Sequence, residues 1–172
     1  THVTLEAVIK PCHCHEYPQT THFLDVAPTD ALVLADRGFY GYSVLKHGSD
    51  IGRQLLVRVA SHVKFESIKT LSDGSSLARI YPTTRDGRHQ TNGLIIRVIR
   101  YRIDDPNRTG HQIEHRLATT LLDEQTYPAT ELIVLYHQRW EIEMDNDELT
   151  THQLLNRPVE LRSRTPVGCV QE

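Results

Sequence analysis

A continuous apolar run at residues 31–35, Ala-Leu-Val-Leu-Ala, constrains the fold of this chain more than any other feature. A short run without a polar position is typical of a strand buried on both faces of a sheet. Asp36 follows the run directly, so it is expected at the carboxyl end of that strand. Because open α/β sheets gather their functional residues at this end, the run predicts an α/β fold with Asp36 near a site.

A later segment carries three polar side chains with helical spacing. Tyr136, Arg139 and Glu143 stand at i, i+3 and i+7. A helix turns about 100° per residue, so this spacing places a phenol, a cation and a carboxylate on one face. Pro128 suits the first turn of such a helix, which we expect to extend to about residue 153.

The rest of the chain reads as further strands and short helices. Turn signals at Asp73-Gly74, Asp86-Gly87 and Asp105-Pro106-Asn107 separate the strands of a β-rich stretch. We expect helices at residues 20–26 and 40–47, the second closed by Gly48. The expected strands cover residues 3–9, 54–59, 77–81, 94–103 and 117–122.

Composition limits the class of protein. With 38% apolar and 24% charged residues, the 172-residue chain is an ordinary globular protein rather than a disordered or membrane one. The net charge of −3 argues against a uniformly basic nucleic-acid binder, so any DNA contact must come from local clusters. Three cysteines, two of them one residue apart, argue against a disulfide scaffold and for a reduced cytoplasm.

Several segments together resemble the DDE transposases of bacterial insertion sequences. The match is to the branch with a Tyr-x2-Arg-x3-Glu-x6-Lys signature, the fourth insertion-sequence family. Two departures stand out: Thr150 occupies the place of the signature lysine, and the first catalytic aspartate of the family has no counterpart. The resemblance rests on Tyr136, Arg139 and Glu143, on Leu34-Ala35-Asp36-Arg37-Gly38-Phe39, on Leu71-Ser72-Asp73-Gly74-Ser75, on Ile103-Asp104-Asp105-Pro106 and on Leu161-Arg162-Ser163-Arg164-Thr165-Pro166.

The resemblance implies a fold and a domain plan. The fold is α/β, a ribonuclease-H-like transposase catalytic core that lacks its first strands, with a β-rich insertion between the second aspartate and the catalytic glutamate. Residues 1–64 form the partial core, 65–123 the insertion, and 124–172 the catalytic helix and the start of a C-terminal helical region, all in one structural domain. The chain opens inside a strand-like run and stops as another helix begins, so we expect an internal fragment of a longer transposase.

The resemblance also implies a chemistry. Asp36 and Glu143 are the expected catalytic residues and ligands of Mg²⁺, with Mn²⁺ as a substitute. Tyr136 and Arg139 are expected to bind DNA at the same place, and Arg58 and Lys64 from or beside strands. The function is magnesium-dependent cleavage and strand transfer on double-stranded DNA, at transposon ends and target.

Further expectations concern the setting. The full-length protein is expected to be a homo-oligomer in the bacterial cytoplasm, associated with the nucleoid and not with a membrane. This fragment alone is expected to be inactive, because it lacks the first aspartate.

Other interpretations of these residues remain open. A strand-end aspartate such as Asp36 also caps the turn that follows it, and Glu143 can pair with Arg139 in solvent. Arg97, Arg100 and Arg102 form either a ribbon along a DNA backbone or an ordinary solvated strand face. The rival functions are a catalytically dead remnant that binds DNA or a transposase, and an unrelated metal-dependent nuclease.

Four metal-type side chains stand in a row at Cys12-His13-Cys14-His15. Consecutive residues of an extended chain point to opposite sides, so at most two of them can reach one ion. We expect a local structural role for this segment rather than a zinc site.

Overall fold

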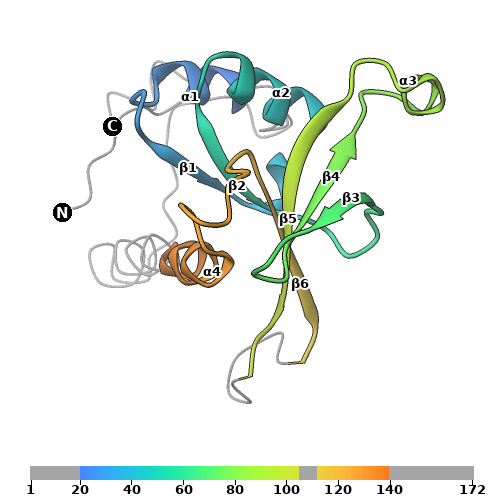
Figure 1. Cartoon of the computed structure of the whole chain (residues 1–172). Helices are drawn as coiled ribbons and strands as arrows, with labels where there is room; N and C mark the ends of the chain where they lie inside the picture. Colours follow the sequence, from blue (N-terminus) through green and yellow to red (C-terminus); the bar gives the residue numbers. More distant parts are fainter. Residues whose placement is uncertain (1–19, 105–111, 140–172) are drawn as a thin grey trace, which may run out of the picture.

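One six-stranded sheet organises the computed structural model, which describes residues 20–104 and 112–139 (Figure 1). The strand order is β1-β2-β6-β5-β4-β3, with β1 and β2 parallel and every other pair antiparallel. The architecture is therefore mixed α/β, as the sequence predicts. The strands are β1 (Leu32–Ala35), β2 (Gln54–Arg58), β3 (Glu66–Thr70), β4 (Ser76–Ile80), β5 (Leu94–Arg102) and β6 (Glu114–Thr119).

Helices cover both faces of the sheet around β2, the second strand in this order. Leu55 and Val57 of β2 pack with residues of α1 (Thr20–Val26) and α2 (Tyr42–Asp50) on one face. Leu56, between them, points to the other face and packs with α4 (Ala129–Gln138). This alternation follows from the two-residue period of a strand, and in Figure 1 the orange α4 lies across the sheet from the blue and teal α1 and α2.

The strand that carries Asp36 differs from its prediction. Residues 32–35 do form β1, but all four are half-buried rather than buried on both faces. The reason is its position, because β1 stands at the end of the described sheet and pairs only with β2. The strands predicted at residues 54–59, 77–81, 94–103 and 117–122 are present to within a few residues, and the helix expected at residues 20–26 is confirmed as α1.

Two short helices also correct the sequence analysis. The helix predicted over 40–47 is present as α2, but it begins at Tyr42 and continues past Gly48 to Asp50, and a 3-10 turn, η2 (Arg37–Phe39), precedes it. The turn predicted at Asp86-Gly87 lies instead inside α3 (Thr84–His89), whose N-cap Thr83 accepts a hydrogen bond from the Asp86 amide. The Asp73-Gly74 turn is confirmed between β3 and β4, where Gly74 has φ +81°.

Gly48 lies in α2 at a position where the core leaves no room for a side chain. A Cβ at this position would lie 2.1 Å from Cδ1 of Leu55, which is fully buried. We therefore expect Gly48→Ala to lower the free energy of unfolding by about 1–3 kcal/mol through overpacking, although alanine alone favours a helix by about 1 kcal/mol. Gly38→Ala, where a Cβ meets nothing within 4 Å, is the control. Urea unfolding followed by circular dichroism tests this, and a Gly48→Ala protein more stable than the parent would contradict it.

Several predicted elements lie outside the described residues: the strand at 3–9, the turn at 105–107 and the helix beyond Arg139. None of the helices within residues 20–104 and 112–139 combines the length and apolar character needed to cross a bilayer.

Candidate functional site

Asp36 stands where the sequence analysis expects it, directly after the last residue of β1. Its side chain is exposed, and Oδ1 accepts a hydrogen bond of 2.8 Å from the Arg37 amide. The capping role is therefore present in the structure. It does not exclude a second role, because an ionised carboxylate has several acceptor sites. Ala35 pairs with Val57 in the parallel register, so Asp36 and Arg58 follow side by side at the carboxyl ends of β1 and β2.

Tyr136 joins the signature helix to this strand end. Its hydroxyl donates a 3.3 Å hydrogen bond to the carbonyl oxygen of Ala35, the residue before Asp36. The side chain is only 4% exposed, and burial raises the pKa of Tyr136 to about 12. The charges of Arg139 and Arg58 oppose this rise, whereas the charge of Asp36 adds to it. At neutral pH the phenol is therefore protonated and able to donate.

Two arginines surround the Tyr136 phenol. The Arg139 Cζ atom lies 5.6 Å from the centroid of the Tyr136 ring, within the range of a cation–π contact. Arg58, on β2, is half-buried and has its Nη2 atom 3.0 Å from Nδ1 of His115. Four of the predicted site residues, Asp36, Arg58, Tyr136 and Arg139, therefore gather around the carboxyl ends of β1 and β2.

The remaining predicted residues do not join this group. Glu143 lies outside the described residues, as do Thr150 and the Cys12–His15 segment. Lys64 is exposed and lines a separate hollow of about 520 Å³ between β4, α3 and Tyr40. Arg97 is fully buried, so for this residue neither alternative holds: it belongs neither to a DNA-tracking ribbon nor to a solvated strand face. Arg100 and Arg102 are exposed on β5.

Aromatic and imidazole rings beside the arginines were missed by the sequence analysis. Tyr101 on β5 pairs in register with His115 on β6, and their ring centroids are 5.3 Å apart. Tyr101 also meets His137 of α4 edge-to-face, at 5.6 Å. Desolvation raises the pKa of Tyr101, and the charge of Arg58 opposes this rise. The one available signal was the alternation Arg100-Tyr101-Arg102, which puts Tyr101 on the opposite strand face from its neighbours.

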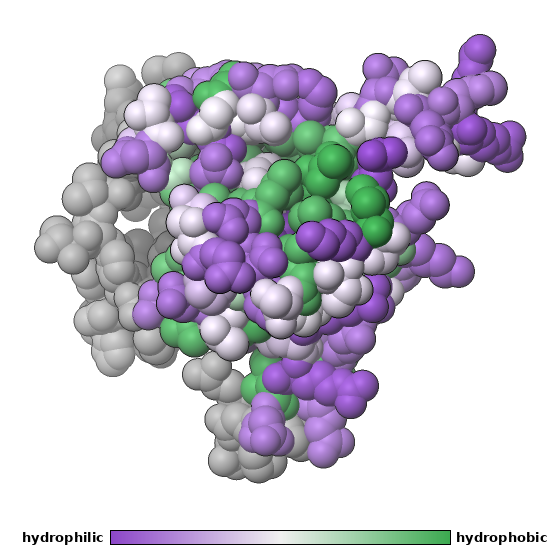
Figure 2. All heavy atoms as spheres, in the orientation of Figure 1, coloured by the Kyte–Doolittle hydropathy of each residue, from purple (hydrophilic) through white to green (hydrophobic). Residues whose placement is uncertain are grey.

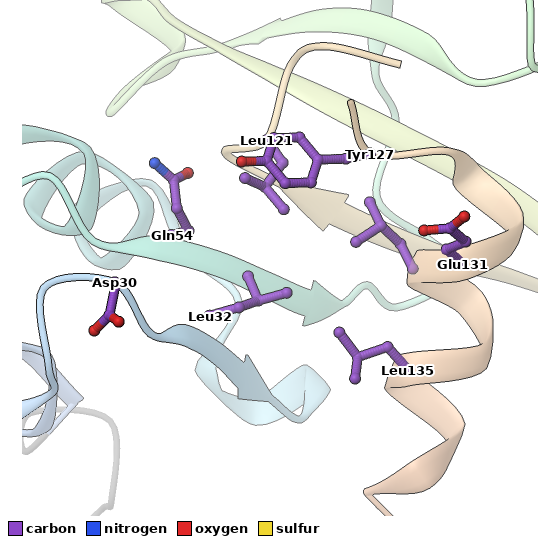
Figure 3. Close-up of a pocket in the computed structure, with 8 residues that line it drawn as sticks. Asp30, Leu32, Gln54, Leu121, Tyr127, Glu131 and Leu135 are labelled. Atoms are coloured by element: carbon purple, nitrogen blue, oxygen red, sulfur yellow. The ribbon is translucent and has the colours of Figure 1, made fainter. Parts of the chain in front are cut away.

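A cavity beside α4 lies away from this site. Figure 3 displays a cavity of about 370 Å³ between β1, β2 and α4. Leu32 and Gln54 line it at the amino ends of β1 and β2, so it lies at the opposite end of β1 from Asp36. The lining residues are Asp30, Leu32, Gln54, Leu121, Tyr127, Glu131, Leu132 and Leu135.

Two projections of the surface carry mainly hydrophilic side chains. Figure 2 displays them over α3, at the upper right, and around the far end of the β5–β6 pair, at the bottom. Apolar side chains gather between these two regions on the same face.

No complete metal site lies within the described residues. Among residues 20–104 and 112–139, no group of three His, Cys, Asp or Glu side chains is placed to hold a metal ion. Asp36 is an exposed carboxylate at a strand end, which fits one oxygen ligand of a hard cation such as Mg²⁺. Glu143, the second expected ligand, lies beyond the described helix α4.

Comparison with known proteins places this geometry in a family context. Residues 1–164 match the sequence model of a family described as the transposase DDE domain. The transposase InsG for insertion sequence element IS4, from Escherichia coli strain K12, is 30% identical to the chain over 145 residues. The matched region covers 83% of this chain and 32% of that relative, so the chain spans about a third of the relative's length.

Proposed function

Because the chain belongs to the DDE transposases of the IS4 type, we propose that it carries part of the machinery that cuts and joins DNA strands during transposition. The observation that carries the proposal is the hydrogen bond from Tyr136 to Ala35. It holds the helix of the Tyr-Arg-Glu signature against the strand end that carries Asp36.

Asp36 and Glu143 are the proposed catalytic carboxylates. They would hold Mg²⁺, or Mn²⁺ in its place, which activates an oxygen nucleophile and stabilises the leaving oxygen of a phosphodiester. The hydrogen bond from the Arg37 amide fixes the Asp36 carboxylate at the strand end before any metal binds. The parallel β1–β2 pair agrees with a ribonuclease-H-like core, and the strands β3–β6 then form the β-rich insertion, joined to the core through β6 and β2.

Arg139 and Arg58 are the proposed DNA ligands beside Asp36. Arginine provides a permanently charged, planar fork that suits a phosphate group. The Tyr136 ring supports the Arg139 guanidinium, while the Tyr136 hydroxyl is directed at Ala35 rather than outward. Tyr136 therefore acts on DNA mainly by holding Arg139 in place. Lys64, which lines the separate hollow beside β4 and α3, is proposed to contact a phosphate farther along the same DNA.

The wider setting of the function follows from the family. Its partners are double-stranded DNA at transposon ends and target, and further copies of the full-length protein. The proposed location is the bacterial cytoplasm, at the nucleoid. The alternative of an unrelated metal-dependent nuclease is dropped, because the chain belongs to a transposase family.

A non-catalytic DNA-binding remnant is the second candidate. It rests on Arg58 and Arg139, which lie near Tyr136 and the strand end of Asp36, and it needs no metal ion. Both candidates require DNA binding at the Arg58–Arg139 surface, so binding is the property to test first.

We expect the chain to bind duplex DNA with an affinity that falls as salt rises. Each phosphate contact contributes about 0.9 to the slope of log affinity against log salt, so Arg58→Ala and Arg139→Ala should each reduce that slope by about one. Lys46→Ala is the matched control, since Lys46 is an exposed cation paired with Asp50 on α2. Fluorescence anisotropy across a salt series measures the slopes. Equal slopes for the parent and both arginine variants would remove this surface from the DNA contact.

A further inference from the structure

A fully buried arginine lies in the middle of β5, away from the proposed DNA site. Arg97 has 0% exposure and is among the largest fully buried side chains of the described chain. Its Nε donates to Ser75 Oγ at 2.8 Å, and Nη1 donates to the carbonyl oxygens of Tyr127, at 2.6 Å, and Asp123, at 3.5 Å. Nη2 donates to Asp73 Oδ2 in an ion pair. The guanidinium thus connects β5 to two other segments: the β3–β4 turn and the approach to α4.

Asp73 continues this network to the first turn of α4. Its Oδ2 accepts a 2.9 Å hydrogen bond from the Ala129 amide, and Ala129 is the first residue of α4. The N-cap residue of α4 is Pro128, whose side chain makes no capping hydrogen bond. The side-chain oxygen that an N-cap residue usually supplies to the first turn is therefore supplied by Asp73, 56 positions before Ala129. A negative charge at the amino end of a helix also interacts favourably with the helix dipole.

The ionised form of Asp73 is the one that the structure stabilises. Partial desolvation favours the neutral acid, but hydrogen bonds from Ser75 and Ala129 and the charge of Arg97 outweigh it and lower the pKa of Asp73. The Asp73 side chain is 19% exposed and Arg97 is not exposed at all, so the pair is held largely away from water.

The other end of α4 carries the proposed DNA residues. Tyr136 is seven residues after Ala129, about 10 Å along a helix that rises 1.5 Å per residue. The outer face of α4 is open, with Val134 60% exposed and Leu135 37% exposed. Directed contacts at the two ends, Asp73 to Ala129 and Tyr136 to Ala35, therefore fix how far the helix is shifted and turned over the apolar cluster beneath it.

We propose that Asp73 and Arg97 are positioning residues, which hold the start of α4 so that Tyr136 and Arg139 meet the strand end carrying Asp36. Apolar packing alone leaves a helix free to slide over its core by small amounts. A guanidinium group that hydrogen-bonds to several fixed partners removes that freedom. Fixing the register of packed elements is the best-attested role of a buried ion pair. The functional meaning of this arrangement rests on the proposed DNA site.

The test compares Asp73→Asn with a matched control. Asp73→Asn keeps the side-chain shape and removes the charge. Asp86→Asn is the control, since Asp86 also accepts side-chain hydrogen bonds, from Thr91 and Asn92, but belongs to α3 rather than to the start of α4. Nuclear magnetic resonance of ¹³C-labelled tyrosine is the first readout, with the Tyr136 signal assigned through Tyr136→Phe. Tyr40 is the internal reference. Burial raises its pKa to about 12 as well, but its ring packs against Phe65 rather than against α4.

We expect Asp73→Asn to move the Tyr136 signal and to speed amide hydrogen exchange across α4, while the Tyr40 signal stays in place. Asp86→Asn should change neither. Asp73→Glu is the second variant in case Asp73→Asn fails to fold: it keeps Arg97 compensated but displaces the carboxylate, so a smaller shift of the same Tyr136 signal is expected. Unchanged Tyr136 signals and α4 exchange in every folded Asp73 variant would overturn the proposal.

DNA affinity is the second readout, and it separates this proposal from the proposed function. If Asp73 acts through Arg139, then Asp73→Asn should weaken binding several-fold in the parent and much less in an Arg139→Ala background. Equal losses in both backgrounds would contradict positioning. If neither the parent nor the variants bind DNA while the Tyr136 signal still moves, the positioning role stands and the DNA assignment falls.

Discussion

Replacing Asp73 with leucine should lower the free energy of unfolding by about 3–5 kcal/mol, because it leaves the Arg97 charge buried without its partner. That loss is a large share of the roughly 5–15 kcal/mol that holds a typical domain folded. Adding Arg97→Leu should recover a substantial part of it, since two apolar side chains remove both charges together. Recovery should be incomplete, because the Ala129 amide, Ser75 and the Tyr127 carbonyl lose their partners.

Urea unfolding of the parent, both single variants and the double variant completes this cycle. The two losses should be strongly non-additive, as expected for groups in direct contact. A double variant whose loss equals the sum of the single losses would mean that the two side chains do not act as a pair. Lys46→Leu, which breaks the exposed Lys46–Asp50 pair, should cost far less and sets the scale for a surface interaction.

Incubating the chain with supercoiled DNA and Mg²⁺ or Mn²⁺ should give no cleavage above background. Asp36 and Glu143 alone cannot hold two metal ions in the geometry that an in-line displacement needs, and the first aspartate of the family has no counterpart in this sequence. Conversion of supercoiled plasmid to nicked or linear forms on a gel is the measurement. The Asp36→Asn and Glu143→Gln variants are the controls for contaminating nucleases, since they should match the parent. Robust nicking by the parent that disappears in Glu143→Gln would refute this expectation.

Local patterns in the sequence predicted much of the sheet. The apolar run at residues 31–35 predicted β1 and the position of Asp36, because a strand of this kind is recognisable without its neighbours. Its half-buried state was not predictable, because it depends on β1 pairing with β2 alone in the described sheet. The helix α3 was missed because it has only six residues and contains Gly87, so a turn was the better prediction from composition.

In the candidate site, too, local spacing was predictable from the sequence, whereas contacts between distant segments were not. Helical spacing brought Tyr136 and Arg139 together on one face, and the structure has the Arg139 guanidinium over the Tyr136 ring. The contact between Tyr136 and Ala35 joins residues 101 positions apart, which no local pattern encodes. Arg97 fits neither of the two interpretations offered from the sequence, for a simpler reason. It stands an odd number of residues from Arg100 and Arg102, so it belongs to the opposite face of β5, and parity alone would have separated it from them.

The proline at the start of α4 limits how this chain can be recombined with its relatives. The helix α4, whose N-cap residue is Pro128, has no side-chain cap of its own and takes one from the turn between β3 and β4. Grafting the stretch 65–123 from another transposase would exchange that cap along with the strands. Asp73, Arg97 and residues 123–129 therefore have to come from the same parent protein. A chimera whose junction falls between them separates α4 from the carboxylate that caps its first turn.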